Sequence, residues 1–333
     1  MLRSKANQRT ARSWSRTGLI AVALAIATGG CQDNVDVVGP DSSDLATPGD
    51  PQLAFVSTRG GAEAIYVANE DGTLVGRLTN GWGPQWSPDG TKIAFYRVFP
   101  GSPPHSYVIN VDGRGERLIA DAGAVPSWSP DGTRLLYTSP VGTPNGGVFV
   151  VDVDGTNTQL LLSDDFDDPG SGDHLSDASW SPDGRTIAFV RSNYDKGSQI
   201  FIMNADGSSP RVLISTLPSL EPSWSPDGRT IAFGSFRNIG SINADGTDYR
   251  TYDPSLAFNP DWSPDGSKLV YNAFSSTIGD EISGLGSRMR LYVLDRQTGG
   301  TRQLIPEATS PAKANYWDHQ ASWRRPKQRL FIN

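Results

Sequence analysis

The sequence predicts an all-β protein, a six-bladed β-propeller whose blades are four-stranded and antiparallel. The first observation is a five-residue segment, W-S-P-D-G, that occurs five times. The second is that a short apolar run follows each copy, as a strand after a tight turn would. The third is the spacing of the tryptophans, because intervals of 42, 52, 44 and 38 residues are typical of propeller blades. The five copies occupy residues 86–90, 128–132, 180–184, 224–228 and 262–266.

Each repeat contains four expected strands in the same order. The first strand ends at the tryptophan. S-P-D-G then turns the chain, because proline presets φ, aspartate bonds the nearby backbone and glycine accepts a left-handed conformation. The second and third strands are short apolar runs, such as 187–189 and 200–202. A second turn, for example N-A-D-G at 204–207, leads to the fourth strand. This turn context predicts a structural role, and not a catalytic one, for the repeated aspartates Asp89, Asp131, Asp183, Asp227 and Asp265.

The two ends of the repeat array are incomplete in complementary ways. The first unit, which begins near residue 52, has no tryptophan strand of its own. The last tryptophan strand, 320–323, continues as W-R-R-P and has no second strand after it. We therefore expect the C-terminal strand to complete the first blade, which would leave no open sheet edge. We also expect each repeated tryptophan to pack between neighbouring blades.

The repeated W-S-P-D-G segments resemble the propeller of the TolB family, over residues 52–326. The resemblance implies the propeller fold. Proteins of that family also carry an α/β domain before the propeller, whereas the residues before 52 have the composition of a signal and a tether. The resemblance therefore implies the scaffold, and it leaves a role in the Tol system open.

The N-terminal residues differ in composition from the rest of the chain. Residues 1–30 combine five basic residues with a short apolar run at 19–27, which is the pattern of a secretory signal peptide. The run has about half the length that a membrane-spanning helix needs. The single cysteine, Cys31, follows two glycines in a segment that resembles a bacterial lipobox, which implies lipidation of Cys31. Ordinary secretion with an unmodified thiol is the alternative.

Composition divides the remaining chain and limits its partners. Residues 31–51 are acidic and rich in Pro, Gly and Ser, which predicts a flexible tether, and residues 327–333 form a C-terminal tail. Without residues 1–30 the chain has 24 basic and 36 acidic residues, a net charge of −12, which argues against nucleic acid as a partner. We expect an exported, monomeric, membrane-anchored lipoprotein of the bacterial cell envelope. Gln32 stands where enteric lipoproteins retained in the inner membrane have aspartate, which implies the outer membrane, facing the periplasm.

The loops of the predicted propeller sort onto two faces because its strands alternate in direction. The S-P-D-G and x-D-G turns share one face, and the loops of variable length share the other, where function is usually found. The residues three positions before the tryptophans are expected to ring the mouth of the central channel on that variable face. They are Gly83, Val125, Asp177, Glu221, Asn259 and Gln320.

The polar members of this ring are the candidate ligand-binding residues, Asp177, Glu221, Asn259 and Gln320. Carboxylates and amides at a channel mouth could hold a cation, an N-terminal amine or a basic side chain. A structural water network inside the channel is the alternative.

Histidines and aspartates also collect in the variable loops. His174 and His319 are candidate metal ligands, and the acidic stretch 164–168 is a candidate calcium site. For the histidines the alternative is that polar residues simply collect in loops, because no pair has a recognised metal-ligand spacing. For the acidic stretch the alternative is a solvated loop. No other cofactor is predicted. No catalytic residue is assigned, because the sequence contains no nucleophile elbow, Walker loop or dinucleotide-binding motif.

Two functions fit these features, and a calcium-stabilised structural protein is a third interpretation. The first is a non-enzymatic binding module that presents its variable face and channel mouth to an envelope protein or peptide. The second is a hydrolase or lyase that acts on peptide or glycan with its site on the same face, since propellers also host enzymes. The first is preferred because no catalytic motif is present.

Overall fold

The computed structural model describes residues 52–139, 146–166, 173–193, 197–215, 219–235, 238–252, 257–274, 289–304 and 318–325. These residues belong to one compact unit of the chain, Gly39–Asn333. Within them the chain forms β-strands and turns, so the predicted all-β class is confirmed there. No helix in this part of the chain has the length and apolar character needed to cross a bilayer. The predicted signal peptide, Cys31, the tether and the tail at 327–333 lie outside the described residues.

The strands follow one another closely along the chain, as the repeat predicts. They are β1 (Leu53–Ser57), β2 (Ala64–Ala68), β3 (Leu74–Asn80), β4 (Trp82–Trp86), β5 (Lys92–Arg97), β6 (His105–Asn110), β7 (Arg117–Ala120), β8 (Ala124–Trp128), β9 (Arg134–Thr138), β10 (Gly147–Asp152), β11 (Gln159–Ser163), β12 (His174–Trp180), β13 (Thr186–Asn193), β14 (Gly197–Asn204), β15 (Arg211–Ile214), β16 (Ser219–Trp224), β17 (Thr230–Ser235), β18 (Ile239–Asn243), β19 (Arg250–Thr251), β20 (Ala257–Trp262), β21 (Lys268–Phe274), β22 (Met289–Asp295), β23 (Thr301–Gln303) and β24 (Asp318–Trp323).

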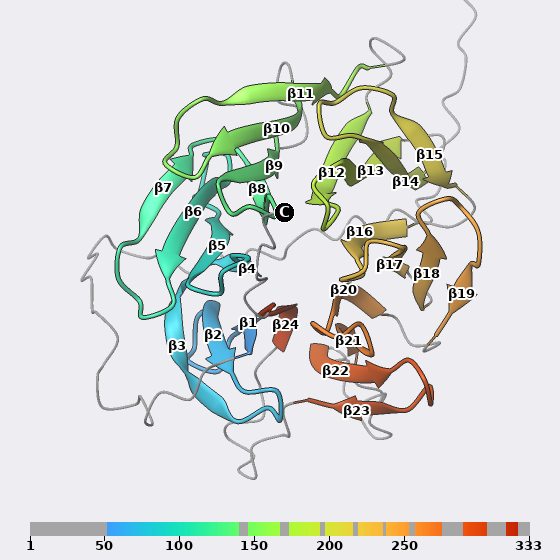
Figure 1. Cartoon of the computed structure of the whole chain (residues 1–333). Coiled ribbons are helices and arrows are strands. Elements are labelled where there is room, and N and C mark those ends of the chain that lie inside the picture. Colours follow the sequence, from blue (N-terminus) through green and yellow to red (C-terminus); the bar gives the residue numbers. More distant parts are fainter. Residues whose placement is uncertain are drawn as a thin grey trace, which may run out of the picture. The chain divides into compact units, whose positions relative to one another are not determined.

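The strands pair into four-stranded antiparallel groups, which is the arrangement of a β-propeller (Figure 1). Three groups consist of consecutive strands, β4–β7, β8–β11 and β12–β15. The groups β16–β19 and β20–β23 are joined in one larger sheet through a single residue pair, Ser235 with Ala257. In Figure 1 the strands β4, β8, β12, β16, β20 and β24 lie nearest the centre, and the later strands of each group lie further out.

The group at the start of the chain contains its last strand. β24 pairs with β1 in antiparallel register, from Leu53 opposite Trp323 to Ser57 opposite Asp318. The order of this sheet is β24–β1–β2–β3. Two ends of the described chain, about 270 residues apart, are therefore hydrogen-bonded in one sheet.

The W-S-P-D-G turns use their aspartates structurally. In the turn after β20, the Ser263 hydroxyl donates to Asp265 Oδ1 (2.6 Å), and the Ser267 N–H donates to the same oxygen (3.0 Å). Gly266 completes the turn with a φ of +71°. The Ser263 hydroxyl is the largest of the donors that lower the pKa of Asp265 to about 2. The same serine-to-aspartate bond recurs in the other copies, at Asp89, Asp131, Asp183 and Asp227.

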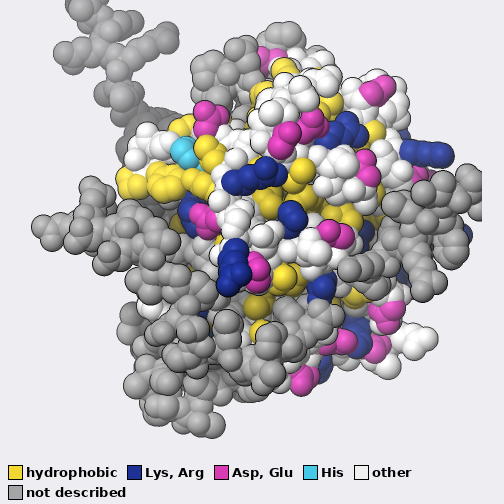
Figure 2. All heavy atoms as spheres, turned by 60° about the vertical axis from the view of Figure 1, so that its left-hand side comes forward, with side chains coloured by type: hydrophobic (Ala, Val, Ile, Leu, Met, Phe, Trp, Pro, Cys, Tyr) yellow, Lys and Arg dark blue, Asp and Glu magenta, His cyan; other side chains and the backbone are white. Residues whose placement is uncertain are grey.

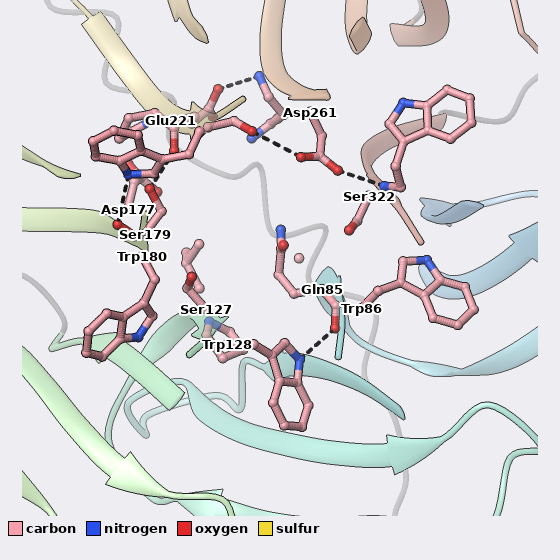
Figure 3. A pocket seen from close by; sticks show the side chains of 18 of the residues that line it. Gln85, Trp86, Ser127, Trp128, Asp177, Ser179, Trp180, Glu221, Asp261 and Ser322 are labelled. Carbon is pink, nitrogen blue, oxygen red and sulfur yellow. Dashed lines mark hydrogen bonds between the residues drawn. The ribbon is translucent and has the colours of Figure 1, made fainter. Parts of the chain in front are cut away.

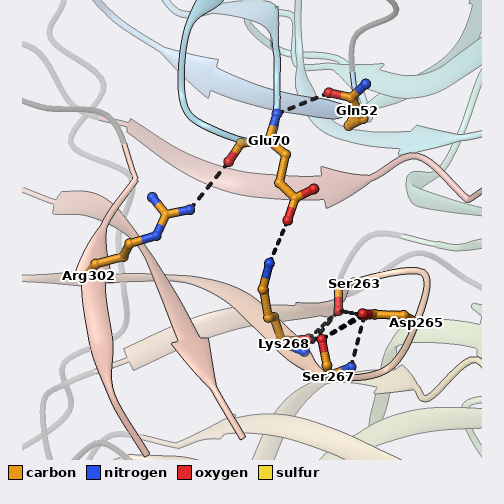
Figure 4. A network of polar contacts seen from close by, with 7 residues as sticks. All are labelled: Gln52, Glu70, Ser263, Asp265, Ser267, Lys268 and Arg302. Atoms are coloured by element: carbon orange, nitrogen blue, oxygen red, sulfur yellow. Dashed lines mark hydrogen bonds and ion pairs between the residues drawn. The ribbon is translucent and has the colours of Figure 1, made fainter. Parts of the chain in front are cut away.

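A polar network connects the first and last groups of strands (Figure 4). Lys268 Nζ lies 2.6 Å from Glu70 Oε1, and Arg302 Nη2 donates to the Glu70 carbonyl oxygen at 3.4 Å. Glu70 follows β2, whereas Lys268 and Arg302 belong to β21 and β23. The network therefore links the sheet that contains β1 and β24 to the sheet that contains β21 and β23.

Each repeated tryptophan packs against the preceding group of strands, so the prediction that these rings lie between blades is confirmed. Trp128 of β8 shares a buried cluster with Ala94 and Val108 of β5 and β6. Its indole Nε1–H donates to the Gln85 carbonyl oxygen of β4 at 3.0 Å. Because the ring fills the contact between two sheets, its loss would affect both.

Candidate functional site at the channel mouth

The six strands nearest the centre enclose one cavity (Figure 3). It contains about 170 Å³ of space that water-sized molecules can occupy. The three residues before the tryptophan in β4, β8, β12, β16, β20 and β24 line it, together with most of the tryptophans, with turn residues such as Pro88 and Pro130, and with Arg325. The six expected ring residues line it, namely Gly83, Val125, Asp177, Glu221, Asn259 and Gln320. The sequence repeat therefore identified the wall of the cavity correctly.

The backbone at these ring positions has an unusual conformation that the sequence analysis missed. All six have a positive φ: 58° at Gly83, 52° at Val125, 52° at Asp177, 57° at Glu221, 50° at Asn259 and 51° at Gln320. Each lies where the pairing of the inner strand shifts register, as between Ser176 and Ser179 in β12. A β-bulge of this kind bends the strand and redirects a side chain, and such bulges are common beside functional sites. Glycine and asparagine, which favour positive φ, were the available signal at two of the six positions.

Asp177 and Glu221 form the acidic part of the wall. They occupy equivalent places on the adjacent strands β12 and β16, both half-buried, and lie on the same side of the cavity in Figure 3. The Ser176 hydroxyl donates to Asp177 Oδ2 (2.9 Å), and the Asn259 N–H donates to Glu221 Oε2 (2.5 Å). Among the described residues, neither carboxylate has a lysine or arginine within ion-pair distance.

This environment changes the acidity of both carboxyl groups. Burial is the largest cause that raises the pKa of Glu221 to about 8, and repulsion from Asp177 adds to it. Burial also raises the pKa of Asp177, against the opposing hydrogen bond from Ser176. A carboxyl group with a pKa near 8 is mostly protonated at neutral pH, because a second negative charge beside the first has no nearby compensation.

Tyr96 occupies the space that glycine leaves at the first ring position. A Cβ on Gly83 would lie 2.8 Å from Tyr96 Cε1, so only glycine permits this approach. The Gly83 N–H donates to Gln320 Oε1 at 2.9 Å, across the junction of β4 with β24. Burial, with added repulsion from the two mouth carboxylates, raises the pKa of Tyr96 to about 12. The phenol therefore stays protonated and supplies a hydroxyl donor that sequence reasoning did not find.

A second carboxylate region of the cavity contains this protein's own arginine. Asp261 accepts hydrogen bonds from the Ser223 hydroxyl (3.0 Å) and the Trp323 N–H (2.7 Å). Burial raises its pKa, and the charge of Arg325 acts in the opposite direction. Arg325 lines the same cavity and donates to the Trp224 carbonyl oxygen at 3.4 Å. The cavity thus already accommodates one guanidinium group.

The two candidate metal-ligating histidines lie on different strands and beside different carboxylates. His174 Nδ1 of β12 is 3.9 Å from Asp164 Oδ2. His319 Nε2 of β24 is 3.6 Å from Glu63 Oε1. In the described ranges, no group of three or more His, Cys, Asp or Glu side chains is arranged to hold a metal ion. Metal binding by these histidines stays a prediction, as does calcium binding at 164–168, where residues 167 and 168 lie outside the described residues.

Comparison with known proteins places the repeat in a family. The profile of the TolB beta propeller domain matches residues 80–250, just over half of the chain. The chain belongs to the TolB β-propeller family. The matched region runs from the end of β3 to β19 and includes four of the five W-S-P-D-G segments. The expected resemblance to TolB propellers is therefore confirmed.

Solved structures share the TolB-like fold at low sequence identity. TolB from Acinetobacter baumannii is 21% identical, with a TM-score of 0.65 over 84% of this chain and 68% of that one. A putative TolB from Agrobacterium tumefaciens is 19% identical, with a TM-score of 0.55 over 83% of this chain and 99% of that one. An oligogalacturonate lyase in complex with manganese is 17% identical, with a TM-score of 0.53 over 78% and 75%. A search of curated protein sequences gives no match.

Proposed function

We propose that this protein is a non-enzymatic binding module of the bacterial cell envelope, whose channel mouth and variable loops bind a protein or peptide partner. The observation that carries the proposal is the pair Asp177 and Glu221, two half-buried carboxyl groups at the mouth of an internal cavity. The cationic group that they suit best is a basic side chain or an N-terminal amine of the partner.

The energetics of the mouth support a cationic ligand. A carboxylate that leaves water without a counter-charge is destabilised, and Glu221 responds with a pKa of about 8. A positively charged group beside Asp177 and Glu221 would favour their ionised forms and be held more strongly than in bulk water. Arg325 beside Asp261 supports the same preference inside the same cavity.

We also propose that the propeller has six blades and is closed by β24. The support is that six inner strands line one cavity and that β24 pairs with β1. On this proposal, β16–β19 and β20–β23 are two separate blades, since only one residue pair joins them. A closed scaffold would hold the mouth residues at fixed positions around the channel.

Export and lipid anchoring of this protein are part of the proposal and rest on the sequence of residues 1–31. Lipidated Cys31 would tether the propeller to the outer membrane, facing the periplasm. Mass spectrometry of the mature N-terminus tests this directly. A lipid-modified Cys31 at the N-terminus is the expected result, and an unmodified cysteine or an uncleaved leader would refute the anchor.

The binding function is tested by comparing three baits in an envelope extract. The baits are the wild-type protein, the double variant D177N/E221Q, and D112N, whose substitution removes one charge from an exposed turn residue. Quantitative mass spectrometry then follows each protein that the wild type captures. We expect the double variant to capture at least one partner at least about tenfold less than the wild type does, because truncated hot-spot contacts cost about 2 kcal/mol or more. Equal capture by D177N/E221Q and D112N would reject the mouth as the binding site.

A hydrolase or lyase acting on peptide or glycan is the second candidate. One observation favours it. Glu63 lies between His319 (3.6 Å) and the indole Nε1–H of Trp82 (2.9 Å), so that His319 could act as a base that the Glu63 carboxylate orients. This candidate predicts turnover of a peptide or pectin-type oligosaccharide that is lost in H319Q. A folded wild-type sample without turnover across such substrates would count against it.

A further inference from the structure

The loop between β5 and β6 exposes an apolar surface that the proposed mouth site does not use. Residues 98–105 read V-F-P-G-S-P-P-H. Val98 is 36% exposed and Phe99 is 39% exposed, although both are large apolar side chains. Figure 2 shows a group of hydrophobic side chains at the surface beside a histidine. Exposed aromatic side chains are unfavourable in water, and they are the residues that most often anchor protein interfaces.

The loop is ordered by its own contacts. The Ser102 N–H donates to the Phe99 carbonyl oxygen at 3.2 Å, and the glycine between them, Gly101, has a φ of +75°. The Ser102 hydroxyl lies 3.1 Å from His105 Nε2, and the rings of Phe99 and His105 are 5.0 Å apart. The loop's three prolines further restrict its backbone. Phe99 is therefore presented in a fixed place, so a partner that contacts it pays little ordering entropy in this loop.

The strand register places this loop next to the channel mouth. Tyr96, which lies against Gly83 at the mouth, pairs with Trp82, and Arg97 pairs with His105 at the base of the loop. Phe99 is three residues beyond Tyr96 and follows the end of β5 at Arg97. The apolar loop therefore begins beside the Gly83 position of the ring, whereas Asp177 and Glu221 belong to β12 and β16 in other groups of strands.

The charges around the loop suit an uncharged contact. Arg97 at its base is paired with Glu116, with Nη1 2.6 Å from Oε1, and its guanidinium stacks over Tyr107 at 4.8 Å. The base of the loop thus presents a neutralised ion pair, whereas Asp177 and Glu221 are the acidic groups of the mouth. This division of charge fits a ligand that is basic at one point and apolar at another.

We propose that loop 98–105 is the apolar half of the partner-binding surface and that the partner is an extended peptide segment of a protein. The segment carries a lysine or arginine that enters the mouth and, elsewhere in the segment, an apolar residue that packs on Phe99. An anionic membrane surface is the disfavoured occupant, because the mouth is acidic. This inference rests on the proposed function and specifies the chemistry of its ligand.

A random linear peptide library displayed on phage and selected on the purified full-length protein tests the proposal. Four baits are used, namely the wild type, F99S, D177N/E221Q and L118S. The last is the matched control, because it removes a 46% exposed apolar side chain from the outer strand β7, outside the loop. Near-UV circular dichroism and thermal melting establish that every bait is folded.

The wild type should select peptides with a basic residue and an apolar residue at a constant spacing. F99S should lose the apolar preference and bind a selected peptide at least about tenfold more weakly, while it keeps the basic preference. L118S should behave as the wild type. If F99S binds the selected peptides as tightly as the wild type and selects the same sequences, the present inference is overturned. The mouth site would then be unaffected. If the wild type selects no basic residue, or if D177N/E221Q selects the same basic residues as the wild type, the proposed function is overturned as well.

Discussion

The ring residues before the tryptophans combine an uncommon backbone conformation with the chemistry of the cavity. Asn259 and Gly83 accept positive φ easily, whereas the β-branched Val125 at +52° does not. An L-residue in this conformation costs roughly 1–2 kcal/mol because Cβ approaches the following carbonyl oxygen. The scaffold maintains this conformation at all six positions, which indicates that the bulge is required to shape the channel wall.

Replacement of Val125 by glycine and by alanine separates backbone strain from loss of the side chain. Both variants lose most of the half-buried side chain, whereas only V125G removes the Cβ that strains the positive φ. Glycine also makes the unfolded chain more flexible, so we expect V125G to exceed V125A by up to about 1 kcal/mol in the free energy of unfolding. Urea denaturation of the two variants measures the difference. A V125G protein no more stable than V125A would contradict strain at Val125.

Glu221 should make stability depend on pH. Its pKa is about 8 in the folded protein, against an ordinary value of 4.5, so the folded state binds more protons than the unfolded state between these values. Stability is then highest below pH 4.5 for this group and falls as the pH rises towards 8. E221Q should remove this decline, whereas D112N should follow the wild type. The free energy of unfolding is measured for each protein from pH 5 to 9. If it changes with pH in the same way for E221Q and the wild type, the pKa given for Glu221 is contradicted.

At the scale of the element, the tryptophan that ends each inner strand connects neighbouring groups of strands. W128A should lower the free energy of unfolding by about 3–5 kcal/mol, because a buried indole is lost from the contact between two sheets. L118A, at an exposed position of β7, should change it by less than about 0.5 kcal/mol. A W128A cost below that of L118A would mean that the ring does not support the contact.

Strand order, turn chemistry and the buried tryptophans were predictable because each depends on neighbours in sequence. Asp265, for example, bonds residues within its own turn, so its motif was sufficient. Tyr96 could not be assigned to the mouth, because its position depends on the space left by Gly83 on another strand. Arg325 could not be placed in the cavity, because its side chain contacts the carbonyl oxygen of Trp224, 101 residues away in sequence.

At the scale of the whole molecule, the contacts between the two ends of the array concentrate at β24. This strand pairs with β1, and the Arg324 N–H that follows it donates to the Gln52 carbonyl oxygen at 2.7 Å. The guanidinium of Arg324 also lies over the Trp86 ring at 5.4 Å. One short strand thus contacts the first group of strands and its neighbour.

Removal of β24 is expected to abolish cooperative folding. A protein that ends at residue 317 leaves β1 as an unpaired edge and deprives the cavity of the part of its wall that β24 supplies. Size-exclusion chromatography and thermal melting should show aggregation and no sharp transition. A protein that ends at residue 325 keeps β24 and is the control. Normal melting of the shorter protein would contradict closure by β24.

The central claim is that the mouth carboxyl groups form a site for a cationic group. Carbon-13 NMR titration of the side-chain carboxyls tests it most directly, with the Glu221 signal assigned by its absence in E221Q. The account predicts a midpoint near pH 8 for Glu221, which falls when N-acetyl-arginine amide is added at millimolar concentration. A midpoint near the ordinary value of 4.5 that the arginine derivative leaves unchanged would contradict it.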